Sequence, residues 1–137
     1  MKSQVKSKQR VAQYGEVLTG KEIVNDMLDL VQQETERIDS RFLEPACGTG
    51  NFLTEILERK LRVVEKRYKR NQLEYERYAI LAVSSLYGID ILLDNARECR
   101  KRLFEIFDAS YARLYRLRAK DTCRSAIRYI LEHNIVH

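Results

Sequence analysis

The amino-acid sequence predicts an α/β fold that is rich in helix and contains a short parallel sheet. A short stretch around Phe42 leads into a turn with Gly48 and Gly50, and apolar residues at helical spacing follow this turn. A second short apolar stretch, residues 86–91, lies between two long helical patterns. Two strands joined by a helical crossover run parallel in one sheet, so these stretches predict a strand–helix–strand unit.

Length and composition indicate a single, highly charged domain. The chain has 137 residues, of which 33% are charged, and a formal net charge of +5. This length suffices for one domain with a core. The mild positive charge permits an acidic partner such as DNA without requiring one. The longest uncharged run, residues 78–89, has twelve residues, fewer than the roughly 20 that a membrane helix needs, so we expect no membrane span.

The cysteines and histidines form no pattern typical of a metal site or a disulfide framework. Cys47, Cys99 and Cys123 are widely separated and include no C-x-x-C pair. His133 and His137 lie four residues apart without a third type of ligand nearby. We therefore expect reduced thiols in a cytoplasmic protein, and no metal.

The chain is predicted to begin with a flexible basic arm, residues 1–13, followed by one domain, residues 14–137. The first ten residues carry four cations and no apolar run, which argues against a secretory signal peptide. The next helix has apolar residues on one face, namely Ile23, Val24, Met27, Leu28 and Val31. Thr19 and Glu22 have the spacing of a capping box, so one role of Thr19 is to begin this helix, and this role is compatible with binding a ligand.

The first strand is predicted at residues 41–44, and the turn after it is the centre of the predicted site. Pro45 ends the strand because it cannot donate a ladder hydrogen bond, while Gly48 and Gly50 permit backbone angles closed to other residues. A helix begins near Asn51. The backbone N–H groups of residues 46–50 are therefore expected to be free for a ligand at the helix N-terminus.

The charge beside this turn favours a particular kind of ligand. Phosphate-binding loops carry a cation, whereas no Lys or Arg lies between Arg41 and Arg59. Instead, the carboxylate of Glu44 directly precedes the turn. It would repel phosphate and suits a ligand with positive charge of its own, such as an amino group or a sulfonium. The structural alternative is a tight turn that binds no ligand.

A second long helix is predicted after the helix at residues 51–61. Its apolar and aromatic stripe recurs at spacings of three and four, at Val64, Tyr68, Asn71, Tyr75, Tyr78 and Ala82. Lysines and arginines interleave with the tyrosines, but Glu65, Glu74 and Glu76 interrupt the positive field. We therefore expect the tyrosines to pack on the domain and not to form a nucleic-acid surface.

The second strand, residues 86–91, carries Asp90 near its end. A carboxylate at the C-terminal end of a second parallel strand can hold both hydroxyls of a ribose. In dinucleotide-binding folds this acid follows the glycine turn by about 20 residues. Gly50 and Asp90 are 40 residues apart, and the additional helix accounts for the excess. The alternative role for Asp90 is to cap the next helix.

The remainder of the chain is predicted to be helical almost to its last residue. A helix at residues 93–107 is expected to bury Ala96, Cys99, Leu103 and Ile106. Another helix is predicted from Tyr111. Asn134 is expected to end it in a left-handed cap, before a third strand that begins at Ile135.

Residues 44–52, Glu-Pro-Ala-Cys-Gly-Thr-Gly-Asn-Phe, resemble the S-adenosylmethionine (SAM) binding motif of the amino-group DNA methyltransferases of restriction-modification systems. Residues 10–24 are similar to the segment that precedes this motif, although Leu18 and Gly20 replace its usual aromatic residue and proline. Residues 88–91 look like the second motif of the family. The resemblance implies a truncated, Rossmann-like SAM-dependent methyltransferase fold in which residues 14–137 form the SAM-binding half.

The resemblance also implies a set of cofactor-binding residues, namely Thr19, Glu44, Pro45, Ala46, Cys47, Gly48, Gly50, Asn51, Phe52, Asp90 and Ile91. Glu44 would face the methionine ammonium, and Thr19 and the turn backbone would face its carboxylate and the sulfonium region. Asp90 would bind the ribose, and Ile91 would flank the adenine.

The same resemblance limits what the chain is expected to do. The family's catalytic Asn/Asp/Ser-Pro-Pro-aromatic loop needs adjacent prolines, and Pro45 is the single proline of the sequence. We therefore predict no catalytic residue, and a chain inactive by itself. The intact enzyme would methylate adenine N6 in double-stranded DNA, together with a restriction subunit or a fused nuclease.

Two other functions remain as alternatives. The first is a dinucleotide-binding fragment of an oxidoreductase, disfavoured because Leu53 stands where Gly-x-Gly-x-x-Gly requires its third glycine. The second is a non-enzymatic helical module for DNA binding or assembly that uses the basic arm.

Overall fold

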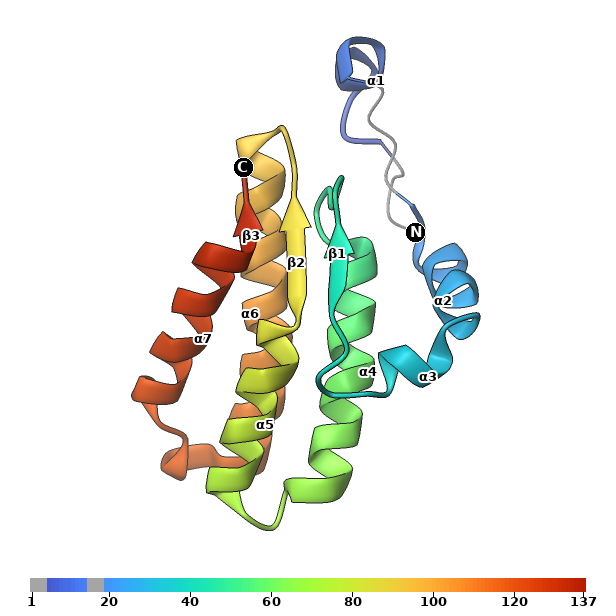
Figure 1. Cartoon of the computed structure of the whole chain (residues 1–137). Coiled ribbons are helices and arrows are strands. Elements are labelled where there is room, and N and C mark those ends of the chain that lie inside the picture. The colour runs from blue at the N-terminus through green and yellow to red at the C-terminus, as the bar shows by residue number, and fades with distance from the viewer. Residues whose placement is uncertain (1–4, 15–18) are drawn as a thin grey trace.

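A computed structural model of the protein describes residues 5–14 and 19–137, which form a helix-rich α/β fold with a small parallel sheet (Figure 1). The strands are β1 (Phe42–Glu44), β2 (Leu86–Ile89) and β3 (Ile135–Val136), in the order β1-β2-β3. Both pairs of strands are parallel. The predicted α/β class and the parallel arrangement of the first two strands are confirmed.

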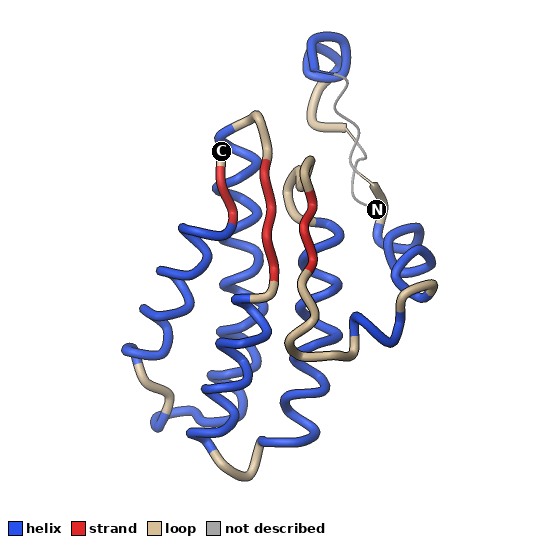
Figure 2. Tube along the Cα trace, in the orientation of Figure 1, coloured by secondary structure: helices blue, strands red, loops and turns tan. Residues whose placement is uncertain are grey.

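The helices surround one side of this sheet. They are α1 (Lys8–Tyr14), α2 (Lys21–Asp29), α3 (Gln32–Thr35), α4 (Asn51–Tyr68), α5 (Gln72–Ser84), α6 (Leu93–Tyr115), the 3-10 turn η1 (Arg116–Arg118) and α7 (Asp121–Asn134). Helices α4 and α6 lie behind the sheet in Figure 1, while α5 and α7 lead up into β2 and β3. The short strands therefore sit at one end of a long bundle of helices (Figure 2).

The sheet is covered on one face and exposed on the other. Leu86 and Ile135 point toward the helices and are fully buried. On the opposite face, Leu43, Tyr87 and Ile89 are exposed by 65%, 36% and 42%. Because side chains alternate along a strand, this difference follows from the register, which pairs Leu43 with Tyr87.

The core lies in the helix bundle and contains a cluster of aromatic rings. Tyr75, Phe107 and Tyr111 are fully buried, and Tyr115 is nearly so. The rings of Phe107 and Tyr111 are 5.3 Å apart between centroids, and those of Tyr75 and Tyr115 are also 5.3 Å apart. The expectation that the tyrosines pack on the domain is confirmed for Tyr75, and Tyr68 and Tyr78 stack on each other at 4.1 Å.

The single long helix predicted along the tyrosine stripe is wrong, because the chain breaks at residues 69–71. Helix α4 continues to Tyr68, and a new helix, α5, begins at Gln72. The side chain of Asn71 accepts a hydrogen bond of 3.1 Å from the N–H of Glu74. Such an N-cap satisfies an otherwise free amide of the first turn. Asn71 therefore begins a helix and does not belong to its interior.

The predicted boundary between the last two helices is also wrong. Helix α6 runs past residue 107 to Tyr115, and α7 begins only at Asp121. The hydroxyl of Tyr111 accepts a hydrogen bond of 2.8 Å from the N–H of Lys120, and this contact holds the start of α7 against α6. Strand β3 follows Asn134 as expected, but the left-handed cap predicted there does not form. The amide of Asn134 donates instead to the carbonyl of Ser84 at 3.1 Å.

The capping box predicted for the first domain helix is not formed. Gly20 is the N-cap of α2, and no side chain accepts a hydrogen bond there. Of the five apolar residues expected on the buried face, only Val24 and Leu28 are buried, whereas Ile23 and Met27 are about half exposed (52% and 50%). Leu18, which departs from the family pattern, lies outside the described residues.

Gly88 marks the tightest contact between the sheet and the turn. A Cβ atom at this position would lie 2.9 Å from Leu53 Cδ1 and 3.0 Å from Cys47 Cβ. We expect Gly88→Ala to lower the free energy of unfolding by about 2 kcal/mol, as overpacking does in a tight core. Gly20→Ala is the control, because Gly20 has φ −70° and is only half-buried, and its replacement should cost less than about 1 kcal/mol. Urea unfolding measures both variants, and equal costs would contradict the packing at Gly88.

Lys60 is fully buried and forms no ion pair within the described parts of the chain. Its ammonium donates to the carbonyls of Ile38 (3.1 Å) and Ser40 (2.5 Å). Burial lowers the pKa of Lys60 from 10.5 to about 8. Between these two pH values the unfolded chain holds a proton that the folded chain has lost, so this group makes stability rise with pH.

We therefore expect the free energy of unfolding of the wild type to rise relative to that of Lys60→Met between pH 8 and pH 10.5. Below pH 8 the difference between the two proteins should be constant. Urea unfolding at several pH values measures it. A difference that does not change with pH across this window would show that the lysine is charged in the folded state throughout.

Candidate functional site

The glycine turn joins β1 to α4, as the sequence predicts. Gly48 and Gly50 both have positive φ, +56° and +93°, a region that other residues rarely adopt. Gly50 is also the N-cap of α4, and a Cβ atom on it would lie 2.7 Å from Cys99 Sγ. The turn thus requires glycine at this position for two reasons, backbone angle and space.

Asp90 lies directly after β2, and its side chain holds the turn. One carboxylate oxygen accepts the N–H of Gly48 at 2.9 Å, and the other accepts the N–H of Leu92 at 2.8 Å. The residue is 8% exposed. The bond to Leu92 orders the start of α6. This is similar to the helix-capping role that the sequence gives as the alternative to ribose binding. The bond to Gly48 connects the ends of two neighbouring parallel strands.

Glu44 lies beside this arrangement, on the same face of the sheet. It is half-buried, and its carboxylate accepts the N–H of Ala46 at 3.2 Å. The register pairs Glu44 with Gly88, and Asp90 follows Gly88 by two residues, so both acids point to the same face. The structure therefore brings together the two carboxylates that the sequence singled out, one on each side of the turn.

The expectation that the amides of residues 46–50 are free is wrong. The N–H of Cys47 donates to the carbonyl of Ile89 at 2.9 Å, and that of Gly50 donates to the carbonyl of Cys47 at 2.9 Å. With the bonds of Ala46 and Gly48 to the two carboxylates, four of the five amides have protein acceptors. The turn folds back onto the end of β2, which accepts the N–H groups of Cys47 and Gly48, and the other two amides are paired with Glu44 and within the turn itself.

Among the described residues, unpaired N–H groups lie directly after the glycine turn, in the first turn of helix α4. Within the described residues, no protein group accepts a hydrogen bond from the N–H groups of Asn51, Phe52 and Leu53. These groups form the first turn of α4, where the partial positive charge of the helix is concentrated.

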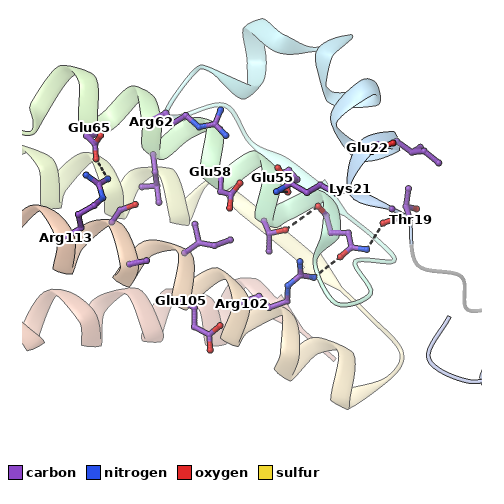
Figure 3. Close-up of a pocket in the computed structure, with 18 residues that line it drawn as sticks. Thr19, Lys21, Glu22, Glu55, Glu58, Arg62, Glu65, Arg102, Glu105 and Arg113 are labelled. Carbon is purple, nitrogen blue, oxygen red and sulfur yellow. Dashed lines mark hydrogen bonds and ion pairs between the residues drawn. The ribbon is translucent and has the colours of Figure 1, made fainter. Parts of the chain in front are cut away.

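Thr19 and Asn51 are held together next to this helix start. The side-chain amide of Asn51 donates to the backbone carbonyl of Thr19 at 2.6 Å. Arg102, on α6, donates through one nitrogen to the carbonyl of Thr49 at 2.9 Å. The same nitrogen donates to the side-chain oxygen of Asn51 at 2.8 Å (Figure 3). Sequence reasoning missed Arg102, because no local motif marks it and only the packing of α6 on α4 brings it to the turn.

A groove of ≈ 1440 Å³ begins at these residues and runs between α2, α4 and α6. Both acidic and basic side chains line it, and Figure 3 shows Glu58 and Glu105 on opposite sides. Burial is the main cause that raises the pKa of Glu58, and the nearby Glu55 adds to it. Thr19 and Asn51 line this groove, whereas Glu44 and Asp90 are not part of its lining. The predicted site residues therefore occupy two adjoining surfaces.

The remaining predicted cofactor residues differ in exposure. Pro45 and Ala46 are exposed on the turn, and Ile91 is 71% exposed beyond β2. Phe52 is half-buried and packs against the core. Cys47 is buried and hydrogen-bonded to Cys99, a contact that lowers the pKa of the Cys47 thiol and raises that of Cys99.

Part of the predicted basic arm reaches the same end of the molecule. Residues 8–14 form α1, and the Arg10 guanidinium lies 2.6 Å from the carboxylate of Asp94 at the start of α6. The hydrogen bond from Arg10 holds the pKa of Asp94 at about 2. Asn95, which Arg10 also contacts, lies 3.4 Å from the carboxylate of Asp90. The arm is thus linked through α6 to the predicted ribose-binding acid.

In residues 5–14 and 19–137, no helix is both long and apolar enough to cross a bilayer. The same residues contain no group of three His, Cys, Asp or Glu side chains arranged to hold a metal ion. The three cysteines are free thiols.

Comparisons of the chain with protein-family models, curated proteins and solved structures find no match.

Asp90 offers a direct test of the turn geometry. In Asp90→Asn an NH₂ group would face one of the two backbone N–H groups that the carboxylate now accepts, so we expect a loss of about 2 kcal/mol of stability. Asp26→Asn is the control, because Asp26 is exposed on α2 and pairs with no cation among the described residues, so its replacement should cost less than about 0.5 kcal/mol. Chemical unfolding measures both variants. A cost for Asp90→Asn no larger than that of the control would contradict the described contacts.

Proposed function

We propose that the chain is the SAM-binding part of a site-specific DNA adenine-N6 methyltransferase of a restriction-modification system, with a truncated Rossmann-like fold. One observation carries the proposal: two carboxylates, Glu44 and Asp90, flank a glycine turn at the carboxyl ends of adjacent parallel strands, and each accepts an N–H of that turn. Ligands of open α/β sheets bind at this edge.

The charge of the two acids supports a cationic nucleoside as the ligand. SAM combines an ammonium, a sulfonium and ribose hydroxyls, and all of them are favourable neighbours for a carboxylate. Glu44 is half-buried and accepts one hydrogen bond, from the N–H of Ala46, so its second oxygen is available to an ammonium. In this proposal Glu44 binds the methionine ammonium.

The acceptor sites of Asp90 are already partly occupied by the protein. Each of its oxygens already accepts one backbone N–H. A carboxylate has about four lone-pair sites, and the oxygen that accepts Leu92 also accepts the side-chain amide of Asn95 at 3.4 Å. One site, on the oxygen bonded to Gly48, is therefore left for a ribose hydroxyl. Ribose binding would therefore add to the bonds that hold the turn, and the acid would keep its structural role.

The methionine carboxylate has a separate set of donors. The first-turn amides of α4 lie next to Thr19, which Asn51 holds in place, and Arg102 adds a positive charge there. An anionic group is stabilised at such a helix start. In this proposal the carboxylate end of the ligand lies toward Thr19, Asn51 and Arg102, and the ribose lies toward Asp90.

The dinucleotide alternative is less well supported. Arg102 supplies the cation that the sequence around the turn lacks, which favours phosphate. However, the amides of Ala46 and Gly48, which a pyrophosphate would need, donate to Glu44 and Asp90. Two carboxylates on the turn itself oppose a pyrophosphate more strongly than one arginine beside it favours one.

The exposed face of the sheet is the face that a truncated Rossmann-like fold would leave without its covering helices. A Rossmann-like sheet carries helices on both faces, whereas here Leu43, Tyr87 and Ile89 are exposed. Strand β1, which leads into the turn, lies at the edge of the sheet order. In the proposed intact enzyme, the half that carries the Pro-Pro-aromatic loop would cover this face.

In the proposed intact enzyme, the half that carries the Pro-Pro-aromatic loop catalyses methyl transfer. When bound, SAM supplies a methyl group on a sulfonium for direct transfer to the adenine amine. The residues of this chain bind and orient the cofactor, and the base leaves the duplex to reach it. Double-stranded DNA and a restriction subunit or fused nuclease are the partners in this proposal.

The test is ligand binding by the 137-residue chain. We expect weak binding of SAM and S-adenosylhomocysteine, weaker binding of NAD, and no methyl transfer to unmethylated DNA. Glu44→Gln should weaken SAM binding about tenfold, because a charged hydrogen bond is worth roughly 1.5 kcal/mol or more. Glu132→Gln, an exposed residue on α7, is the charge-matched control. Ligand-observed NMR titration suits weak affinities.

Tighter binding of NAD than of SAM would favour the oxidoreductase reading. Equal SAM binding by Glu44→Gln and the wild type would remove Glu44 from the site. Methyl transfer by this chain alone would contradict its assignment as the cofactor-binding part.

A further inference from the structure

The end of the helix bundle opposite the strand tips brings two turns together. The first is the α4–α5 turn, residues 69–71, and the second is η1, residues 116–118. The hydroxyl of Tyr115 donates to the carbonyl of Lys69 at 2.9 Å, and the amide of Gln72 donates to the carbonyl of Arg118 at 2.7 Å. Both turns lie at the lower end of the molecule in Figure 2.

These turns gather positive charge. Six exposed cations of this region, which we call the basic end, form no ion pair with any described residue: Lys66, Arg67, Lys69, Arg70, Arg116 and Arg118. Like charges so close together repel one another, and an anionic partner removes that cost.

The acidic residues that interrupt the positive field in the sequence are neutralised in the fold. Glu65 pairs with Arg113, on another helix. Glu74 pairs with Arg77 at 3.3 Å, and Glu76 pairs with Lys120 at 3.4 Å. In the sequence alone, these three glutamates oppose a nucleic-acid surface in this region. Because each has a cation of its own, they do not offset the basic end.

The backbone of η1 is held in an unusual conformation that exposes its side chains. Arg116 has φ +49°, which residues other than glycine rarely adopt. Leu117, between the two arginines, is fully exposed at 102%. Cations in the last turn of a helix commonly offset the helix dipole, and this explains Lys66 and Arg67 in α4. It does not explain Arg70, which lies between α4 and α5, or Arg118, which lies in η1 beyond the end of α6.

We propose that the basic end binds the phosphate backbone of duplex DNA without regard to base sequence. Backbone contacts of this kind need several exposed Lys and Arg side chains, and each contact releases counterions. A membrane surface is disfavoured, because interfacial binding needs an extended apolar face, and Leu117 is the single fully exposed apolar side chain among these cations. The proposal does not depend on the SAM site, which lies at the opposite end of the bundle (Figure 1).

The test compares two triple variants of the full chain that lose the same charge. The first is Lys69→Gln, Arg70→Gln and Arg118→Gln, within the basic end. The control is Lys8→Gln, Arg41→Gln and Arg97→Gln, which are exposed and form no ion pair within the described ranges. Binding to a fluorescent 20-base-pair duplex of arbitrary sequence is measured by anisotropy from about 50 to 200 mM salt.

We expect salt-dependent binding by the wild type and at least a tenfold loss at about 50 mM salt for the basic-end variant. Its slope of log affinity against log salt should fall by roughly 2.7, about 0.9 for each phosphate contact removed. The control variant should keep the wild-type slope. Circular dichroism and thermal unfolding confirm that both variants are folded.

Equal losses in the two triple variants would reduce the effect to net charge and overturn the proposal. So would wild-type binding to vesicles with 30% phosphatidylserine in the absence of binding to the duplex. Glu44→Gln, which tests the cofactor site, should leave the salt slope unchanged, so the two proposals can fail separately.

Discussion

A carboxylate–amide hydrogen bond between Asp90 and the N–H of Gly48 joins the two halves of the strand–helix–strand unit. The other oxygen of Asp90 orders the start of α6 through Leu92. Around this bond the chain is closely packed: Gly88 has no room for a Cβ atom, and Gly50 lies against Cys99. The shape of the turn and the placement of α6 therefore depend on one buried acid at the end of β2.

This constraint also decides which ligands the turn can accept. Glycine turns at helix starts commonly bind phosphate through free amides, but here the amides serve the protein itself. The carboxylates of Glu44 and Asp90 place negative charge beside the turn. Among the described residues, the unpaired N–H groups lie in the first turn of α4, directly after it. Arg102 adds positive charge only on that side. The arrangement separates an anion-binding part from a part that suits ammonium and hydroxyl groups, which matches an amino-acid nucleoside such as SAM.

The helix bundle separates this site from the basic end. Ion pairs between helices neutralise glutamates that would otherwise weaken the positive field, as Glu65 with Arg113 illustrates. Polar contacts thus have two effects: they join α4, α5, α6 and α7 into one bundle, and they leave excess cations on its far turns. In the two proposals, the chain contacts its cofactor and the DNA backbone with opposite ends of the helix bundle.

Local patterns were sufficient for the strands at Phe42 and Leu86, the glycine turn, the start of α4 at Asn51 and the position of Asp90 after β2. Each of these is fixed by backbone chemistry within a few residues. The same patterns failed at Asn71, where a cap begins a new helix, and at Tyr111, which lies inside α6 and not at the start of the last helix. Two of the amides expected to be free in the turn donate to the end of β2, and Arg102 and Arg118 reached their places only through helix packing. Such contacts join residues far apart in the chain, and their partners are chosen by the geometry of the fold and not by any local spacing.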